Sequence, residues 1–218
     1  MSKLRLGVLA SGSGSNLQAI IDYIKCGNLP CEIAVVISDK PEAYALKRAE
    51  LNGIKTEAVQ SKTFQNREDF DTQLVGILKD HNVELVVLAG FMRVVTRILI
   101  NAFPMRIMNI HPALLPSFPG LHVQEKAIEY GAKFSGCTVH FVDEGVDTGP
   151  IIIQAVVPVY DNDTEETLSA RILKEEHRIY PYAIKLFAEG RLEVKERRVS
   201  VKDHPKTEGA MENPPVSY

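Results

Sequence analysis

Residues 4–16 read LRLGVLASGSGSN, an apolar run followed by a loop of glycines and serines. A short apolar run that ends in such a loop predicts a buried strand and a tight turn. Residues 16–25 then carry apolar side chains at helical spacing, so the loop leads into a helix. The stretch therefore predicts a strand, a glycine-rich loop and a helix, which together begin a βαβ unit.

The same alternation continues through the first half of the chain. The predicted strands are residues 4–10, 32–38, 85–89 and 105–109, and the predicted helices are residues 16–25, 43–52 and 67–81. Strands that alternate with helices predict right-handed crossovers and a parallel sheet. The sequence thus predicts an α/β fold with a Rossmann-like, mostly parallel twisted sheet flanked by helices.

The pattern changes after Gly136. Two closely spaced strands are expected at residues 137–142 and 151–159, and a long helix follows at residues 164–188. Closely spaced strands with a short connection pair side by side in opposite directions. We therefore expect antiparallel strands in the C-terminal half of the chain.

Composition bounds the class of protein. The chain has 218 residues, 45% of them hydrophobic, so we expect one large domain over residues 1–198. Prolines among charges predict a loosely ordered tail over residues 199–218. A net charge of −3 gives no general attraction to nucleic acid or to an anionic membrane. No apolar run reaches the ~20 residues of a transmembrane span, and the start turns polar too soon for a signal peptide.

The cysteines and histidines suggest neither a disulfide framework nor a metal site. The chain has 3 cysteines, an odd number, and they lack the spacing of zinc ligands. We therefore expect a cytoplasmic protein that needs no metal. Its expected partners are small molecules rather than nucleic acid or membrane, and a homodimer is left open.

The loop at residues 11–16, SGSGSN, is a candidate anion site. Glycines allow close backbone approach, and the helix that follows offers free N–H groups to a phosphate. The loop is not a dinucleotide fingerprint, because Leu17 stands where a third glycine is needed, and it lacks the Gly-Lys-Ser/Thr of a P-loop. The alternative is an ordinary tight turn in which Ser15 or Asn16 caps the helix.

Residues 108–120, MNIHPALLPSFPG, carry the strongest functional signal. Period-two alternation sends Asn109 and His111 to one side of a strand, and Pro112 then ends that strand. Ligands bind beyond the carboxyl ends of strands in open parallel sheets. An amide that donates at any pH beside an imidazole resembles half of an oxyanion site. The alternative is an asparagine that satisfies a turn beside a histidine at a strand end.

Two further stretches are weaker candidates. Residues 136–152, GCTVHFVDEGVDTGPII, place Asp147 in a loop between two strands, where it is either catalytic or part of an ordinary turn. His140 alternates with apolar neighbours, so it is a core histidine or one that supports the site. Residues 86–95, VVLAGFMRVV, could receive a flat apolar ligand, although on spacing alone a strand-to-helix turn that fills core is the stronger interpretation.

Taken together and in this order over residues 5–190, SGSGSN, VVLAGFMRVV, NIHPALLPSFPG and GCTVHFVDEGVDTGP closely resemble the folate-dependent phosphoribosylglycinamide formyltransferase family. Asn109, His111 and Asp147 coincide with that family's catalytic trio. The resemblance implies transfer of the formyl group of 10-formyltetrahydrofolate to the amine of glycinamide ribonucleotide in purine synthesis. Ala113 stands where many relatives have serine, but it lies outside the trio.

The resemblance also implies the binding residues. Those for the ribonucleotide are Gly14, Ser15, Asn16 and Glu176. Those for the folate co-substrate are Arg67, Met92, Arg93, Val94, Val95 and Asn109. An amine that attacks a formyl carbonyl leaves charge on the carbonyl oxygen, which preorganised donors stabilise. Asn109 and protonated His111 are expected to donate, and Asp147 is expected to favour the imidazolium and to relay the amine's proton.

Other functions remain open from the sequence. Formyltetrahydrofolate hydrolases and other folate-dependent formyltransferases share the asparagine, histidine and aspartate. They would be expected to carry a regulatory module before Leu4 or a basic tRNA-binding domain, which this sequence does not show. A non-catalytic nucleotide-binding regulator that uses the SGSGSN loop is the alternative from another class. Activity and ligand binding that survive replacement of Asn109 would favour it.

Overall fold

The computed structural model describes residues 3–203, 209, 211 and 213. Its described strands form one nine-stranded sheet in the order β3-β2-β1-β4-β5-β6-β7-β9-β8. The strands are β1 (Leu4–Leu9), β2 (Cys31–Ser38), β3 (Thr56–Ala58), β4 (Leu85–Leu88), β5 (Ile107–His111), β6 (Phe134–Phe141), β7 (Ile151–Pro158), β8 (Leu192–Lys195) and β9 (Arg198–Val201). The helices are α1 (Ser15–Lys25), α2 (Tyr44–Leu51), α3 (Arg67–Asp80), α4 (Arg97–Ala102), α5 (Val123–Glu129) and α6 (Glu165–Ala188), with a 3-10 turn, η1, at Ser61–Thr63.

The sheet has a parallel part and an antiparallel part. Strands β3, β2, β1, β4 and β5 run parallel, whereas β6 pairs antiparallel with both β5 and β7. All four residues of β4 are buried, as expected for a parallel strand covered on both faces. The predicted fold class, a mostly parallel sheet with antiparallel strands in the C-terminal half, is confirmed.

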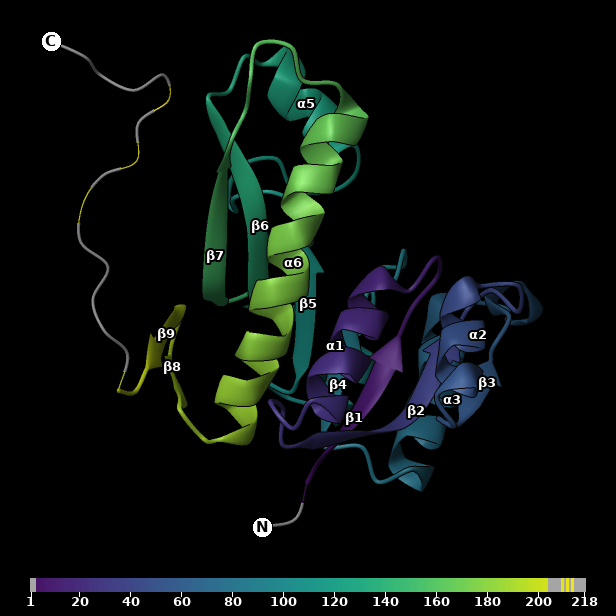
Figure 1. Ribbon diagram of the computed structural model, residues 1–218. Helices are drawn as coiled ribbons and strands as arrows, with labels where there is room; N and C mark the ends of the chain where they lie inside the picture. Colours follow the sequence, from purple (N-terminus) through teal and green to yellow (C-terminus); the bar gives the residue numbers. More distant parts are fainter. Residues whose placement is uncertain (1–2, 204–208, 210, 212, 214–218) are drawn as a thin grey trace, which may run out of the picture.

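Helices cover the two faces of the sheet unequally (Figure 1). Apolar residues of α1, α2, α5 and α6 share one buried cluster, and those of α3 and α4 share the other. The long helix α6 packs against α1, β6 and β7. The hydroxyl of Tyr180, which is fully buried on α6, contacts the carbonyl oxygens of Leu88 at 3.0 Å and Met108 at 2.9 Å. Helix α6 is thereby tied to β4 and β5, next to the strand end that carries Asn109.

Several predicted boundaries are wrong, including that of β6, which we expected at residues 137–142 but which begins at Phe134. We expected a strand at residues 105–109, but β5 spans Ile107–His111, because Met105 adopts a left-handed conformation with φ of 55° that a strand cannot include. We expected the loose tail to start at residue 199, which instead lies inside β9. Val199 and Val201 alternate with more exposed neighbours, and β9 pairs with β8 along its length. The expected tail at residues 204–208, 210, 212 and 214–218 lies outside the described residues.

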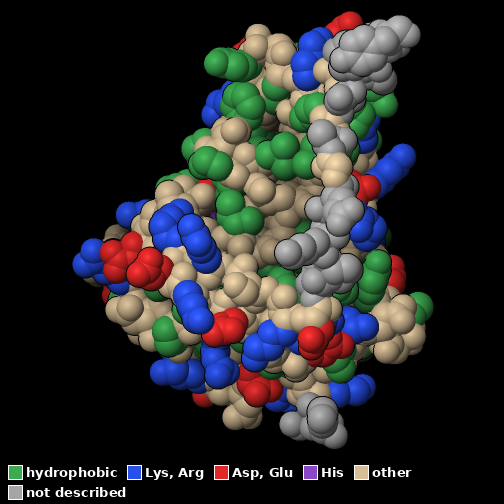
Figure 2. Space-filling model, turned by 90° about the vertical axis from the view of Figure 1, so that its left-hand side faces the viewer, with side chains coloured by type: hydrophobic (Ala, Val, Ile, Leu, Met, Phe, Trp, Pro, Cys, Tyr) green, Lys and Arg blue, Asp and Glu red, His purple; other side chains and the backbone are tan. Residues whose placement is uncertain are grey.

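The surface mixes charges of both signs. Figure 2 shows one face on which basic and acidic side chains intersperse over the lower part, whereas hydrophobic side chains gather higher up. Within the described part of the chain, no helix is both long enough and apolar enough to cross a membrane.

Candidate functional site

The loop between β1 and α1 lies at the carboxyl edge of the parallel strands. Gly14 occupies the N-cap position of α1 with φ of 70°, and no side chain caps the helix. A Cβ at Gly14 would lie 2.8 Å from the Cα of Ala45, so the position requires glycine on two grounds. The alternative in which Ser15 or Asn16 is the N-cap is wrong. The first backbone N–H groups of α1 are thus left without a capping side chain.

Asn16 and Glu176 form a buried pair beside this loop. The Nδ2 atom of Asn16 donates to Oε2 of Glu176 at 2.7 Å, and the two residues are only 8% and 7% exposed. The Oδ1 atom of Asn16 is buried and has no hydrogen-bond partner. Burial raises the pKa of Glu176, which the hydrogen bond from Asn16 opposes in part. Helix α6 brings Glu176 to the start of α1, although the two residues are far apart in the sequence.

The end of β5 carries the predicted amide and imidazole. Asn109 is partly buried and His111 is buried at 4% exposure. In the antiparallel pairing with β6, Asn109 lies opposite His140 and His111 lies opposite Thr138. Both side chains therefore lie where the parallel and antiparallel parts of the sheet meet.

Asp147 reaches this strand end from the loop between β6 and β7, in a left-handed conformation with φ of 54°. Its Oδ2 atom lies 3.4 Å from Nδ1 of His111 and accepts a hydrogen bond from the Gly120 N–H at 2.9 Å. The Nε2 atom of His111 lies 2.9 Å from the carbonyl oxygen of Phe118. Both ring nitrogens of His111 thus face oxygen acceptors, an arrangement that a doubly protonated ring satisfies on both sides.

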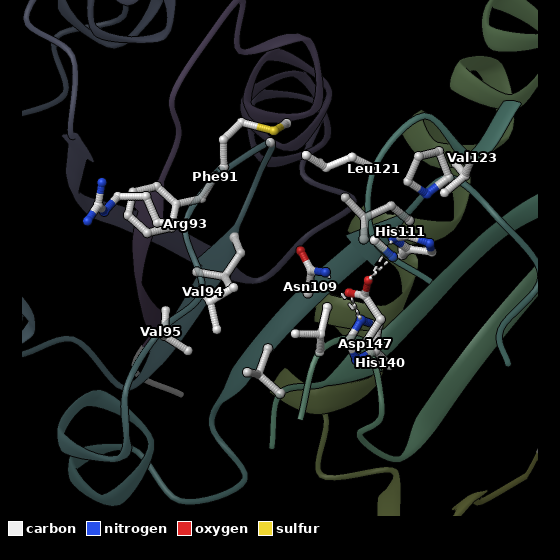
Figure 3. A pocket seen from close by; sticks show the side chains of 18 of the residues that line it. Phe91, Arg93, Val94, Val95, Asn109, His111, Leu121, Val123, His140 and Asp147 are labelled. Atoms are coloured by element: carbon white, nitrogen blue, oxygen red, sulfur yellow. Dashed lines mark hydrogen bonds and ion pairs between the residues drawn. The ribbon is translucent and has the colours of Figure 1, made fainter. Parts of the chain in front are cut away.

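The Asp147 carboxylate lies between two imidazole rings (Figure 3). Its Oδ1 atom is 3.7 Å from Nε2 of His140, which also lies 3.2 Å from Nδ2 of Asn109. His140 is buried at 2% exposure, and this burial lowers its pKa. The histidine left open in the sequence is therefore in contact with the predicted trio.

A cavity of about 400 Å³ joins these residues to the segment after β4. Its lining includes the catalytic candidates Asn109, His111 and Asp147 together with Met92, Arg93, Val94 and Val95. Figure 3 shows Val94 and Val95 across the hollow from His111 and Asp147. Its volume falls in the ordinary range of small-molecule sites, about 300–1,000 Å³. Arg67, which is exposed at the start of α3, is not among the lining residues.

Arg93 is anchored away from the catalytic candidates. Its guanidinium donates to Oγ of Ser61 at 2.9 Å and stacks 4.9 Å from the ring centre of Phe70. A planar cation held over an aromatic ring keeps a fixed direction. Arg93 therefore offers an oriented positive charge at the end of the cavity opposite His111.

The predicted ribonucleotide residues lie outside this lining but are connected to it. Ser11 donates its N–H to the Gly90 carbonyl at 3.0 Å, and its hydroxyl accepts the Met92 N–H at 3.0 Å. The glycine-rich loop and the cavity segment are thus hydrogen-bonded to each other. No local sequence pattern signals these links or the contacts of Phe118 and Gly120, because all the groups involved except the Ser11 hydroxyl are backbone groups.

Among the residues that the structure describes, no group of three or more His, Cys, Asp or Glu side chains is arranged to hold a metal ion. The two buried thiols lie apart from the cavity. Burial raises the pKa of Cys31 to about 12 and also raises that of Cys137, so neither is an activated nucleophile.

The chain is similar to known proteins over most of its length. The formyl transferase family model matches residues 4–184. The phosphoribosylglycinamide formyltransferase of Escherichia coli is 42% identical over 193 residues, which are 88% of this chain and 91% of that protein. The crystal structure of glycinamide ribonucleotide transformylase 1 from Symbiobacterium toebii has a TM-score of 0.91 and 54% identity, and covers 93% of this chain and 95% of that one.

Longer proteins contain a similar region. The trifunctional purine biosynthetic protein adenosine-3 of Chironomus tentans is 48% identical over 190 residues, which are 86% of this chain but only 14% of that protein. The match therefore concerns one part of that relative. The family model, the identity to relatives of similar length and the shared fold agree that this chain belongs to the formyl transferase family.

Proposed function

We propose that the chain transfers the formyl group of 10-formyltetrahydrofolate to the amine of glycinamide ribonucleotide, as a phosphoribosylglycinamide formyltransferase of de novo purine synthesis. The observation that carries the proposal is the cluster of Asn109, His111 and Asp147 at one end of a cavity, in a chain of this family. Amide, imidazole and carboxylate groups are the types that direct acyl transfer between amines requires.

The chemistry assigns a role to each group. The amine nitrogen attacks the formyl carbon, and the carbonyl electron pair moves to the oxygen of a tetrahedral intermediate. N–H groups of Asn109 and His111 stabilise that oxygen. The new nitrogen loses a proton, directly or through water, toward Asp147. The intermediate then collapses, the bond to the folate nitrogen breaks, and that nitrogen leaves with a proton. No acyl-enzyme forms.

Access to His111 depends on its present partner. Its Nε2 atom lies 2.9 Å from the Phe118 carbonyl oxygen, so a substrate oxygen competes with that carbonyl for the same N–H. The hydrogen bond from Gly120 holds Asp147 against Nδ1 of the same ring. Backbone groups of residues 118–120 therefore contact both His111 and Asp147.

The binding roles are part of the same proposal. The uncapped start of α1 supports Gly14, Ser15 and Asn16 as holders of the ribonucleotide phosphate, since helix N-termini bind anions. Glu176 is assigned to the ribose hydroxyls, beside the unpartnered Oδ1 of Asn16. The proposed folate residues are Arg67, Met92, Arg93, Val94, Val95 and Asn109, of which Arg67 lies outside the cavity lining.

One assay tests the reaction. Purified protein is mixed with 10-formyltetrahydrofolate, with and without glycinamide ribonucleotide, and folate absorbance is followed. We expect turnover only when the ribonucleotide is present. Equal turnover without it would identify a hydrolase, and no turnover in either mixture would favour a binding protein.

The acceptor is tested by removing its phosphate. Binding energy from a remote phosphate helps to position the amine, so the dephosphorylated riboside should lose turnover as well as affinity. Comparable rates with glycinamide ribonucleotide, its riboside and methionyl-tRNA would overturn the acceptor assignment.

We also expect a cytoplasmic enzyme with small-molecule partners. A chelator should leave turnover unchanged, whereas a stoichiometric zinc required for activity would contradict this.

A further inference from the structure

His140 lies directly opposite Asn109 in the regular antiparallel pairing of β6 with β5. The pairing of β6 with β7 changes register between Val139 and His140, whereas the pairing of β6 with β5 stays regular from Met108 to His111. The extra residue at this shift, Ile152, lies in β7, so the pairing of His140 with Asn109 does not depend on it. The ring of His140 is buried at 2% exposure, so its hydrogen bonds are formed with protein groups.

The tautomer of His140 follows from its partners. Its Nδ1 atom lies 2.8 Å from the carbonyl oxygen of Phe141, which can only accept, so Nδ1 carries the proton. Asp147, Asp143 and His111 face the ring, and burial is the largest influence on its pKa, which is lowered. The neutral ring therefore presents a bare Nε2. Asp147 Oδ1 is 3.7 Å away, too far to share a proton with it directly.

A bare Nε2 fixes the direction of the Asn109 amide. Nδ2 of Asn109 lies 3.2 Å from this atom and donates to it, and Figure 3 shows the amide with its nitrogen toward His140. The other N–H of the same amide remains free. Without an acceptor at His140, the amide can turn by 180° and present its oxygen, which repels a developing negative charge.

We propose that His140 is a positioning residue, which holds the Asn109 amide so that an N–H rather than the oxygen faces the reacting formyl oxygen. This role rests on the proposed formyl transfer. It adds a third side chain to the oxyanion site, acting through Asn109 without touching the substrate.

Two substitutions separate the two hydrogen bonds of the ring. In His140→Gln the amide oxygen takes the place of Nε2, so an acceptor for Asn109 is kept. In His140→Asn the shorter amide reaches the position of Nδ1 and can still donate to Phe141, but nothing accepts from Asn109. We expect His140→Asn to lower kcat about tenfold, since one orienting hydrogen bond is lost. KM for both substrates should change less than about twofold, and His140→Gln should retain most of the wild-type kcat.

A double-mutant cycle tests whether His140 acts on kcat through Asn109. In an Asn109→Ala background, His140→Asn should cause no further loss of kcat, because the side chain that it orients is gone. A loss that multiplies with that of Asn109→Ala would overturn the proposal. So would a His140→Gln enzyme as slow as His140→Asn, with melting temperatures showing that both variants are folded.

A measurement on the unliganded wild type is independent of activity. Imidazole ¹⁵N NMR should show His140 neutral with its proton on Nδ1 throughout the active pH range. A proton on Nε2 would overturn this inference and leave the proposed function intact. A wild-type protein with that tautomer but no formyl transfer would instead overturn the proposed function, and with it the role assigned to His140.

Discussion

The two ends of the site hold their polar groups differently. At the glycine-rich loop, the start of α1 is uncapped and the buried Oδ1 of Asn16 has no partner. At the end of β5, Asn109, His111 and Asp147 each have a hydrogen-bond or ion-pair partner. Buried polar groups without a partner cost stability, so their presence marks a place where a ligand completes the bonding. This contrast supports the proposal that the first end binds the ribonucleotide and that the second holds a fixed geometry.

The largest expected effect is at the fixed end. Asp147→Ala should lower kcat by about 10² to 10³, the typical cost of losing one group that stabilises the transition state. The KM for the ribonucleotide should change little, because Asp147 lies in the loop between β6 and β7, whereas the proposed phosphate loop joins β1 to α1. Initial rates with both substrates varied measure this. An Asp147→Ala enzyme with near-normal turnover would show that the arrangement around His111 is structural.

At the glycine-rich loop we expect KM to change more than kcat. Gly14→Val places a Cβ 2.8 Å from Ala45 and forces a branched residue into φ of 70°, so the loop must move. KM for the ribonucleotide should rise about tenfold or more, since the left-handed conformation alone costs roughly 1–2 kcal/mol. A Cβ at Gly12 meets nothing within 4 Å, which makes Gly12→Ala the matched control. If only the affinity for folate changed, the loop would bind the folate and not the ribonucleotide phosphate, which would contradict the assignment.

The parallel part of the fold was accessible from sequence because its signals are local. Residues 85–89 are an uninterrupted apolar run and residues 4–10 contain one charge, Arg5, and the helices between the strands have clear periodicity. The elements that were missed are short. Helix α5 has seven residues and starts after His122 in a left-handed conformation without a capping side chain, so the usual signal for a helix start is absent. Packing, rather than local propensity, stabilises such an element.

The candidate site also contains some residues that local sequence patterns predict and others that only the tertiary structure brings in. Asn109 and His111 are two residues apart on one strand, and their convergence follows from strand geometry. That Asp147 joins them depends on the pairing of β5, β6 and β7, which no local pattern specifies. The Phe118 carbonyl and the Gly120 N–H are backbone groups, whose contacts have no sequence signature. Asn16 and Glu176 were assigned to the ribonucleotide only by the resemblance, and their contact with each other, which depends on how α6 packs on α1, was not predicted.

Tyr180 connects the two ends, and its removal should affect stability more than turnover. Its hydroxyl bridges the carbonyl oxygens of Leu88 and Met108, one turn of α6 from Glu176. Tyr180→Phe leaves those buried carbonyls without this donor and should cost about 1–3 kcal/mol in the free energy of unfolding. Urea denaturation measures the loss. Tyr182→Phe, at a side chain that is 37% exposed, is the control and should cost much less.

The smallest expected effect is a pH dependence of stability that has opposite signs at the two ends. The folded pKa of His140 lies below its unfolded value of 6.5, so its contribution is complete above pH 6.5 and is lost as pH falls through that value. The folded pKa of Glu176 lies above its unfolded value of 4.5, so its contribution is present below pH 4.5 and is lost as pH rises toward the folded value. Each group changes the slope by at most about 1.4 kcal/mol per pH unit.

Urea unfolding between pH 4.5 and 8 should therefore show that Glu176→Gln gains stability relative to wild type as pH rises from 4.5, whereas His140→Gln gains stability as pH falls below 6.5. His122→Gln, at an exposed side chain, controls for removing a histidine. If the free energies of unfolding of wild type and Glu176→Gln changed with pH in parallel, burial would not raise the pKa of Glu176. The polar groups at the glycine-rich loop would then be as fully hydrogen-bonded as those at the end of β5.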